Sequence, residues 1–363
     1  MNLTAEQSRL NEHYTKQKNW LKWGPYLSER QWGTVREDYS ANGDAWNYIT
    51  HDMARSKAYR WGEEGIAGFS DDKQMLCLSL ALWNGKDAIL KERLFGLTNG
   101  EGNHGEDVKE LYYYLDSTPT HSYMKMLYKY VQSAYPYQWL LDENKRRGKL
   151  DPEFELMDTG LLNNDQYFDV FTEFTKNAED DLLIKYTIYN RGEEDSELHL
   201  LPQLWFRNTW SWQPEAKKPR ITHLDKNTLQ LQSEAGLYYC HLEGDAELLF
   251  TENETNNERL YHSENTSAFV KDGINDFVVN GNQAAINPEK TGTKTALHYK
   301  LNIAAKQSVE VRLRLSSAHQ PDPFDDFDVI ITNRIKEADE FYAQKQQSIS
   351  NEDEKLVQRQ AFA

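Results

Sequence analysis

The chain has 363 residues, of which 39% are hydrophobic and 12% aromatic, and its formal net charge is -17. This length suits two domains or one large all-β domain, and the hydrophobic content is enough for a substantial core. The acidic balance, without any basic tract, argues against a nucleic-acid partner, and no apolar run approaches the ~18 residues of a membrane helix. The N-terminus has no apolar leader pattern, so we expect a cytoplasmic protein without a membrane partner. Cys77 and Cys240 lie far apart in apolar runs and are expected to be buried free thiols.

The first part of the chain predicts a mixture of short elements. Residues 3–23 predict a loose helical or extended entry, and the region up to Tyr137 is rich in Gly, Trp and Tyr. Residues 99–107 form a polar, glycine-broken loop, and residues 142–148 a solvated charge run typical of a helix end or turn. Strand candidates in this part are Gly33–Tyr39, Gln74–Trp83 and Val108–Leu115.

From Phe154 onwards the period-two alternation of β-strands becomes stronger. Many short strands, each with one half-polar face and few helices between them, predict a large antiparallel sandwich. Residues 190–193 predict a turn between two of these strands. The strand candidates are Tyr167–Phe174, Leu182–Tyr189, Glu197–Phe206, Thr228–Gln232, Gly236–Leu242, Glu247–Thr251, Ala296–Ile303 and Ser308–Leu315.

The tail changes to a helical period after Pro321-Asp322-Pro323. Apolar residues follow a helical stripe through 324–347, and a second helix begins near Glu354. We expect a β-sandwich over residues 1–320 with helix concentrated after Pro323, a helical linker over 321–350, and the start of a further helical domain over 351–363.

One aromatic segment, residues 20–48, interleaves tryptophans and tyrosines with carboxylates and arginines. Such rings stack on the C–H face of a pyranose while the charged groups hold its hydroxyls. Core packing explains any single tryptophan here better, by roughly three to one. Both interpretations stay open on these residues alone.

Adjacent carboxylates occur at four places, but neighbours in a strand point to opposite faces and neighbours in a turn usually cap or solvate. We therefore expect no catalytic role for them; the pairs are Glu37-Asp38, Glu63-Glu64, Asp71-Asp72 and Glu106-Asp107. The loop at 101–107 offers His104, Glu106 and Asp107 to a metal but lacks the ligand spacing of an EF-hand, so no metal and no cofactor are expected. His51 and His121 are as well explained by structural hydrogen bonds as by ligation.

A second aromatic segment runs from Leu204 to Trp212 and predicts a strand entering an aromatic loop. Trp205 is expected to pack between sheets. Trp210 and Trp212, beyond the strand, are candidates for contact with another domain or a ligand.

Several long motifs resemble one family, the bacterial glycoside hydrolase family 63 enzymes related to the processing α-glucosidase of N-glycans. The resemblance covers nearly the whole chain; its motifs are WGPYLSERQWGTVREDYS (23–40), AYRWGEEGIAGFSDD (58–72), LALWNG (80–85), LKERLFGLTNGEGNHGEDVKELYYYLDSTPTHSYMKMLYKY (90–130), LPQLWFRNTWSW (201–212) and KLVQRQAFA (355–363). It implies an N-terminal super-β-sandwich joined by a helical linker to an (α/α)6 barrel, which is missing from this chain. In such enzymes the barrel holds the inverting acid and base, about 6.5–9.5 Å apart.

The resemblance thus implies a non-catalytic N-terminal domain of a glycosidase that acts on α-glucosides or related oligosaccharides by inversion. It would brace the barrel, its intramolecular partner, and shape the rim of the pocket for the oligosaccharide substrate. No residue of this chain matches a catalytic position, so the isolated chain is expected to be inactive. A stand-alone carbohydrate-binding module is the alternative. Candidates for the substrate rim or the interdomain contact are Trp32, Arg36, Asp38, His104, Glu106, Trp210 and Trp212.

Overall fold

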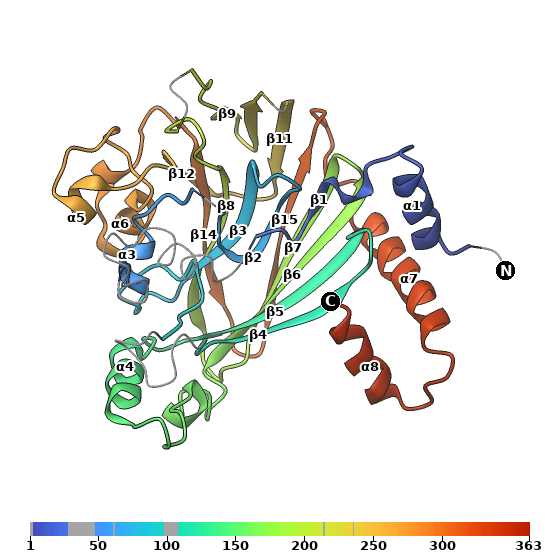
Figure 1. Cartoon of the computed structure of the whole chain (residues 1–363), viewed down its shortest axis with the longest axis horizontal. Coiled ribbons are helices and arrows are strands. Elements are labelled where there is room, and N and C mark those ends of the chain that lie inside the picture. Colours follow the sequence, from blue (N-terminus) through green and yellow to red (C-terminus); the bar gives the residue numbers. More distant parts are fainter. Residues whose placement is uncertain (1–2, 28–47, 61, 98–107, 213–214, 235) are drawn as a thin grey trace.

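A computed structural model describes residues 3–27, 48–60, 62–97, 108–212, 215–234 and 236–363. Within these residues the chain is mainly β and forms two large antiparallel sheets, one of six strands and one of nine (Figure 1). The six-stranded sheet runs in the order β1 (Trp23–Gly24), β2 (Ile66–Asp71), β3 (Leu76–Trp83), β8 (Ser196–Phe206), β14 (Lys294–Ile303) and β12 (Glu247–Thr251).

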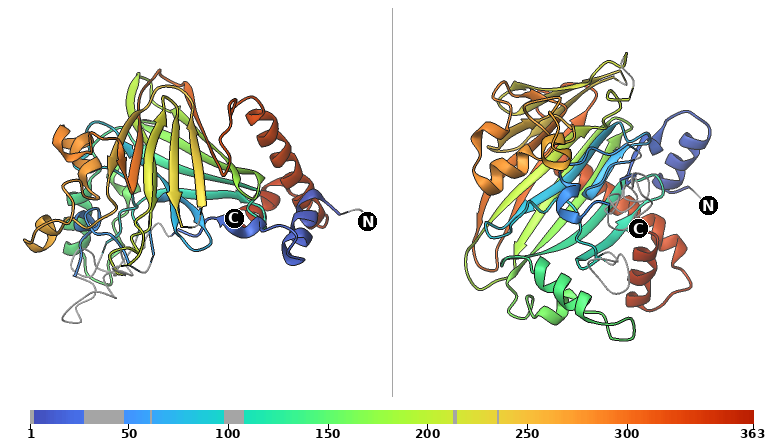
Figure 2. Two further views of the ribbon diagram at one scale, coloured as in Figure 1. Left: turned by 90° about the horizontal axis from the view of Figure 1, so that it is seen from above. Right: turned by 60° about the vertical axis from the view of Figure 1, so that its left-hand side comes forward.

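The nine-stranded sheet faces it and takes strands from the middle and the end of the chain. Its order is β13 (Thr291–Gly292), β9 (Arg220–Asp225), β10 (Thr228–Ser233), β11 (Gly236–Leu242), β15 (Ser308–Ser316), β7 (Asp181–Asn190), β6 (Tyr167–Ala178), β5 (Tyr123–Val131) and β4 (Leu111–Ser117). The two further views show its long strands side by side, with the helices gathered at the margins of the sandwich (Figure 2).

The described helices are short, apart from one. They are α1 (Ala5–Tyr14), α3 (His51–Ala54), α4 (Tyr137–Arg146), α5 (Asn257–Tyr261), α6 (Gly273–Asn280), α7 (Phe327–Lys345) and α8 (Glu352–Ala361), with 3-10 turns η1 (Trp20–Lys22), η3 (Leu156–Thr159) and η4 (Gln283–Ala285). Helix α7 covers one end of the nine-stranded sheet, where Phe327, Ile330 and Ile331 pack on Leu183. None of the described helices is both long and apolar enough to cross a membrane.

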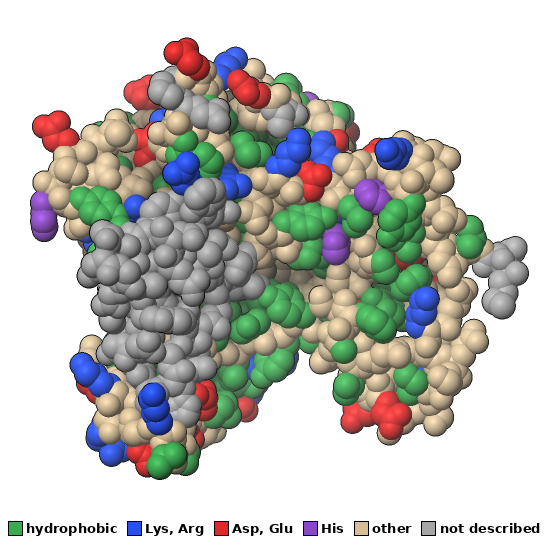
Figure 3. All heavy atoms as spheres, viewed as in Figure 1, with side chains coloured by type: hydrophobic (Ala, Val, Ile, Leu, Met, Phe, Trp, Pro, Cys, Tyr) green, Lys and Arg blue, Asp and Glu red, His purple; other side chains and the backbone are tan. Residues whose placement is uncertain are grey.

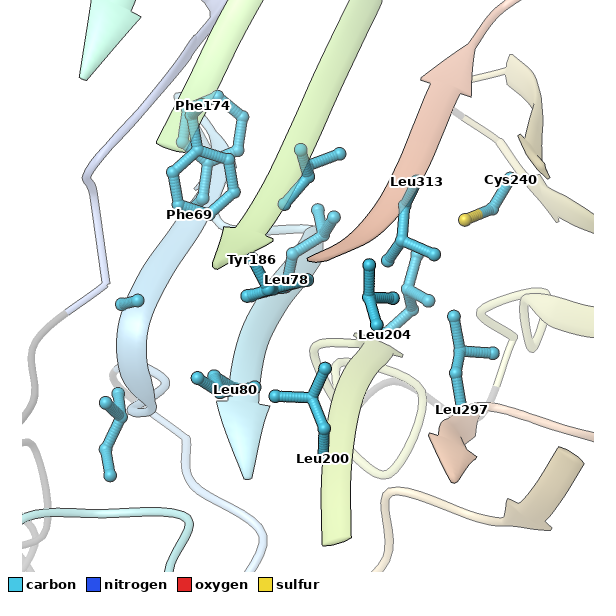
Figure 4. Packing of buried hydrophobic residues seen from close by; sticks show 14 of the residues in the cluster. Phe69, Leu78, Leu80, Phe174, Tyr186, Leu200, Leu204, Cys240, Leu297 and Leu313 are labelled. Carbon is cyan, nitrogen blue, oxygen red and sulfur yellow. The ribbon is translucent and has the colours of Figure 1, made fainter. Parts of the chain in front are cut away.

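The main core lies between the sheets and is built by the alternation of the strands. Leu78 and Leu80 of β3, with Leu200 and Leu204 of β8, point inward and are almost fully buried (Figure 4). At one margin Phe69 of β2 stacks on Phe174 of β6, with ring centroids 4.5 Å apart. Because one face of each long strand is apolar, burial of that face sets the register of both sheets.

Most of the predicted elements are confirmed: β3, β4, β6–β8, β10–β12, β14, β15 and both C-terminal helices lie where the periodicity placed them. The charge run at 142–148 is the end and the exit of α4. The expected helix 324–347 appears as α7 and the second C-terminal helix as α8. The strand expected at Gly33–Tyr39 and the loop at 99–107 lie outside the described residues.

Two expectations about the secondary structure are wrong. Helix is not concentrated after Pro323, because α1, α4 and α6 precede it. Helix α6 carries glycine, valine and asparagine, which are weak helix formers, so local propensity gave no signal for it. Residues 190–193 do not close a hairpin: β7 and β8 belong to different sheets, so this connection crosses the sandwich.

Trp205 is buried, as expected, but not between the sheets. Alternation places Leu204 and Phe206 in the core and turns Trp205 to the outer face of the six-stranded sheet, where it packs with Leu27 and Cys77. Both cysteines are buried and free, and burial raises the pKa of the Cys240 thiol to about 12.

Candidate functional site

The outer face of the six-stranded sheet is covered by loops and helices instead of solvent, and its side chains fall into successive bands. Next to the small apolar band of Trp205 lies a polar band built on Ser79 and Gln203. A second apolar band follows, in which α6 packs on Ala81 and Leu201. The polar band lies between two apolar ones, so its charges must find partners within the protein.

Six charged side chains fill the polar band, three acidic and three basic, each at most 8% exposed. They are Glu63, Glu64, Glu92, Arg93, Lys271 and Lys294. The Arg93 guanidinium joins two of the acids: Nε donates to Glu64 Oε1 at 2.7 Å and Nη2 to Glu92 Oε1 at 2.7 Å. Glu64 also accepts the hydroxyl of Tyr59. The band is thus charge-balanced and hydrogen-bonded, as a buried ionic cluster requires.

The lysines and amides complete this network. Lys294 Nζ lies 3.6 Å from Glu92 Oε2, and Gln203 donates to the same oxygen at 3.3 Å. Asn253 Nδ2 donates to Glu63 Oε1 at 3.0 Å. Lys271 donates to the carbonyl of Lys57 and lies 4.2 Å from the centroid of the Tyr59 ring.

Burial and neighbouring charges act in opposite directions on the acids of this band. Burial raises the pKa of Glu63, whereas at Glu92 the effect of burial is outweighed by the charges of Arg93 and Lys294, which lower its pKa to about 2. Burial lowers the pKa of Lys271 to about 8. A raised carboxyl pKa is also what a general acid needs, so access to this band decides its role.

Access is closed among the described residues. The cavity inside the band measures about 10 Å³, which is room for about one water molecule and not for a sugar ring. Two buried donors at this cavity, Arg93 Nη1 and Trp205 Nε1, have no hydrogen-bond partner, and one water could serve them. In the described part, Glu63 and Glu64 are thus held by hydrogen bonds within the protein, around a cavity too small for a sugar ring.

A wider cleft opens at the margin of the sandwich, where β2 faces β4, β5 and β6. Its volume is about 190 Å³, which exceeds the roughly 150 Å³ of a cavity that accepts benzene. The space-filling view shows hydrophobic side chains gathered in the hollow between the sheets and α8 (Figure 3). The lining residues are Pro25, Leu27, Ala67, Gly68, Tyr114, Asp116, Ser117, Met124, Lys125, Met126, Thr172, Phe174 and Ala363.

This cleft has apolar walls with few polar groups. Tyr114 is 42% exposed, so its ring is open to a ligand. The carboxylate of Asp116 is paired with Arg359 of α8, with Oδ2 and Nη2 2.5 Å apart. Gly68 allows β2 to lie close to Leu27, because a Cβ at position 68 would meet Leu27 Cβ at 2.5 Å. This arrangement suits binding of a ring, and the described residues of the cleft include no facing pair of free carboxylates.

Trp210 and Trp212 lie near the end of β8 and already have partners in the chain. Trp210 Nε1 donates to Glu254 Oε1 at 3.0 Å. The ring of Trp212 has the guanidinium carbons of Arg60 and Arg207 at 5.4 and 5.5 Å from its centroid. Both side chains are half-buried, so contact with a ligand or another domain stays a prediction.

The other predicted rim residues lie outside the described residues: Trp32, Arg36, Asp38, His104 and Glu106. Only the residues that flank their segments are described. Leu27, which precedes the first segment, lines the cleft, and Val108, which follows the second, forms an isolated bridge with Gly96. The structure thus brings the start of the aromatic segment to the cleft but does not test its individual residues.

Three further aromatic or histidine candidates from the sequence are buried and contact other side chains of the chain. Trp20 and Trp23 are buried, and their indole nitrogens donate to Glu12 and Asp180. His51 is buried against Phe95, with ring centroids 5.1 Å apart. Among the described residues, no group of three or more His, Cys, Asp or Glu side chains is placed to hold a metal ion.

Sequence reasoning missed the buried charged band. Arg93 and Lys294 were not among the predicted site residues, because single basic residues in a strand or loop normally face solvent. A signal does exist in the run Lys91-Glu92-Arg93, in which three consecutive charges lie between the apolar pairs Ile89-Leu90 and Leu94-Phe95. Lys91 is also fully buried, and its Nζ pairs with Glu110 Oε1 at 2.5 Å.

Comparison with known proteins gives one sequence relative. The uncharacterized protein YMR196W of Saccharomyces cerevisiae is 42% identical over 408 residues, covering 99% of this chain and 38% of that protein. The chain therefore spans well under half the length of this curated relative. No family model matches the chain.

Solved structures give weak likenesses. An aldose 1-epimerase of Escherichia coli K12, described as putative, is 7% identical over 56% of this chain and 67% of that one, with a TM-score of 0.27. The 4-alpha-glucanotransferase of Thermococcus litoralis is 9% identical over 75% of this chain and 30% of that one, with a TM-score of 0.29. A galactose mutarotase related enzyme of Lactobacillus acidophilus is 8% identical over 69% and 96%, with a TM-score of 0.27. These scores are too low to support an argument on fold or function.

Proposed function

We propose that this chain is the non-catalytic β-sandwich part of a longer glycosidase, which acts on α-glucosides or related oligosaccharides by inversion. The sugar chemistry rests on the family resemblance of the motifs. The proposal that the protein is longer is supported by the yeast relative, of which the chain covers 38%.

The non-catalytic role is supported by the surroundings of the described carboxylates, which are enclosed or paired with basic side chains. Inversion requires two carboxyl groups about 6.5–9.5 Å apart with room for water and substrate between them. In the described part, the acids of the polar band surround a cavity of only about 10 Å³, and Asp116 in the cleft is bound to Arg359. These groups support the fold, and the cleft and α8 would contact the catalytic domain.

Two measurements test this proposal. The coding sequence downstream of Ala363 should encode a helical barrel of several hundred residues. This size is expected because the chain covers 38% of the yeast relative. The chain alone, incubated with an aryl α-glucoside and a panel of glucose disaccharides, should give only the buffer rate, while the longer protein should hydrolyse one of them with inversion. Turnover by the chain alone that a point substitution within it abolishes would overturn the non-catalytic role.

The alternative, a stand-alone sugar-binding module, is favoured by the ring-sized cleft beside Tyr114. In that case the chain alone should bind a glucose oligosaccharide, and Tyr114→Ala should weaken binding by about 1–3 kcal/mol, the loss typical of a buried apolar contact. Tyr113, equally exposed on the same strand but outside the cleft, provides the matched control through Tyr113→Ala.

A further inference from the structure

The cleft between β2 and β4–β6 has one wall on each sheet, and the strand register shifts in both walls. In β2 the pairing with β3 shifts between Ile66 and Phe69, and Ala67 there has a left-handed backbone with φ of 51°. In β4 the pairing with β5 shifts between Tyr114 and Asp116. Such bulges redirect side chains and are frequent at sheet edges and next to active sites, and a left-handed alanine is retained only where its surroundings require it.

One polar atom of this cleft is left without a partner. Asp116 lines the cleft and is 9% exposed. Its Oδ2 is held by Arg359, but its Oδ1 is buried and has no hydrogen-bond partner among the described residues. Arg359 is fixed between two acids, because its Nη1 binds Asp339 Oδ1 at 2.6 Å, and its Nε has no partner in the described part either. The second oxygen of Asp116 is therefore available to a donor in the cleft.

The lysine that lies opposite Asp116 in the register does not serve this oxygen. Lys125 also lines the cleft, but its Nζ lies over the ring of Phe171, 5.1 Å from the centroid. Burial raises the pKa of the Asp116 carboxyl, because its charge loses hydration. A buried carboxylate oxygen without a donor is unfavourable, and a ligand that brings an N–H or O–H removes this cost.

The other walls of the cleft are mainly apolar and limit how many polar groups a ligand can carry. Leu27, Met124, Met126 and Phe174 form much of the lining. A pyranose has a hydroxyl on most of its carbons, so several of them would be buried here without a partner. A planar aromatic ring with a single donor leaves none unpaired, and methionine sulfur contacts such rings favourably. The volume of about 190 Å³ admits one ring of this size.

We propose that this cleft binds a neutral phenol or indole ring, whose O–H or N–H donates to Asp116 Oδ1 while the ring packs on Met124 and Met126. A neutral ligand is favoured because Arg359 already offsets the charge of Asp116. Tyr114, 42% exposed at the same cleft, leaves ring surface for an edge contact. This site goes beyond the proposed glycosidase role, and its ligand differs from the sugar of a binding module.

Methionine methyl signals report on the cleft directly. The chain has six methionines, of which Met124 and Met126 line the cleft and Met53, Met75 and Met157 lie outside it. In a chain labelled with ¹³C at the methionine methyls, Met→Leu substitutions at 124 and 126 assign the two cleft signals. Millimolar indole should shift both of them in a saturable manner, because an aromatic ring shifts the signals of methyl groups packed on it. Benzofuran, which has the same shape without an N–H, should bind at least about tenfold more weakly.

The variant Asp116→Asn tests the hydrogen bond. Its amide oxygen would stay on Arg359 and its NH2 would face the cleft, so the N–H of indole would meet a donor instead of an acceptor. Indole affinity should fall about 10–100-fold, and benzofuran affinity should change less than about twofold. Asp322→Asn, at an exposed aspartate outside the cleft, should leave both affinities unchanged. Unchanged signals of Met53 and Met75 show that a variant retains the fold.

The proposal is overturned if indole leaves both cleft signals unmoved, if benzofuran binds the parent chain as tightly as indole, or if Asp116→Asn and Asp322→Asn bind indole alike. Methyl α-glucoside should not shift the cleft signals; a shift with it and none with indole would assign the cleft to a sugar instead. N-acetyltyrosinamide separates two sources of the ring: affinity equal to that of p-cresol indicates a tyrosine side chain, and weaker binding a free small molecule. The hydrolysis assay decides the glycosidase role separately from these results.

Discussion

Both faces of the six-stranded sheet are largely buried, but the side chains that fill them differ in kind. The inner face offers leucines such as Leu78, Leu200 and Leu204 to the facing sheet. The outer face, on the same strands, carries Ser79, Gln203 and Lys294 under a cluster of buried charges. Apolar burial stabilises each side chain independently, in proportion to its area, whereas a buried ionic cluster is favourable only when every member is present.

The largest expected effect comes from breaking the ionic face. Arg93→Met removes the partner of both Glu64 and Glu92 and leaves their charges buried, which should cost about 3–5 kcal/mol of unfolding free energy. Urea unfolding measures the loss. Arg146→Met, on the exposed end of α4, is the control and should leave the midpoint unchanged.

Removing apolar volume from the inner face should cost slightly less. Leu204→Ala deletes a side chain that is 1% exposed, and a loss of about 2–5 kcal/mol is typical of such a cavity. A double variant that carries both Leu204→Ala and Arg93→Met tests whether the two faces contribute independently to the unfolding free energy. If the two faces are independent, the losses in urea unfolding add; strong coupling would show that the faces do not act separately.

The pH dependence of stability also distinguishes the two faces, because the buried carboxylates of the polar band lie on the outer face. The pKa of Glu92 is about 2 in the folded chain, against 4.5 for an unperturbed glutamate, so its contribution is fully present above pH 4.5 and is lost as the pH falls toward 2. The loss amounts to about 3 kcal/mol at most. Glu92→Gln should flatten the stability curve between pH 4.5 and 2, and a curve parallel to that of the parent chain would contradict the ionic role.

The smallest effect is expected where a charged contact is half-buried. Trp212→Leu removes the ring that contacts Arg60 and Arg207 but keeps apolar bulk, so the cost should be about 0.5–1 kcal/mol per contact at most. Thermal unfolding measures it. A loss comparable to that of Arg93→Met would show that this half-buried segment beyond β8 is part of the core.

The amino-acid sequence by itself determined the class of the fold. The period-two alternation in β6, β7, β14 and β15 and the helical stripe of α7 are local patterns, since each records which side of one element is buried. Free, buried cysteines also followed from local context. Short elements such as α6 and β2 left no such pattern, because their burial depends on what covers them.

Only the tertiary structure decided which charges are structural. Glu63, Glu64 and Arg93 resemble ordinary polar residues in the sequence, and alternation alone could not tell that a second layer covers the outer face of the six-stranded sheet. The same holds for the cleft, since Ala67 and Asp116 belong to different sheets and line one cavity only when the two sheets pack together. Pairing between distant strands is set by the packing of the whole sandwich, and that information is absent from any short segment.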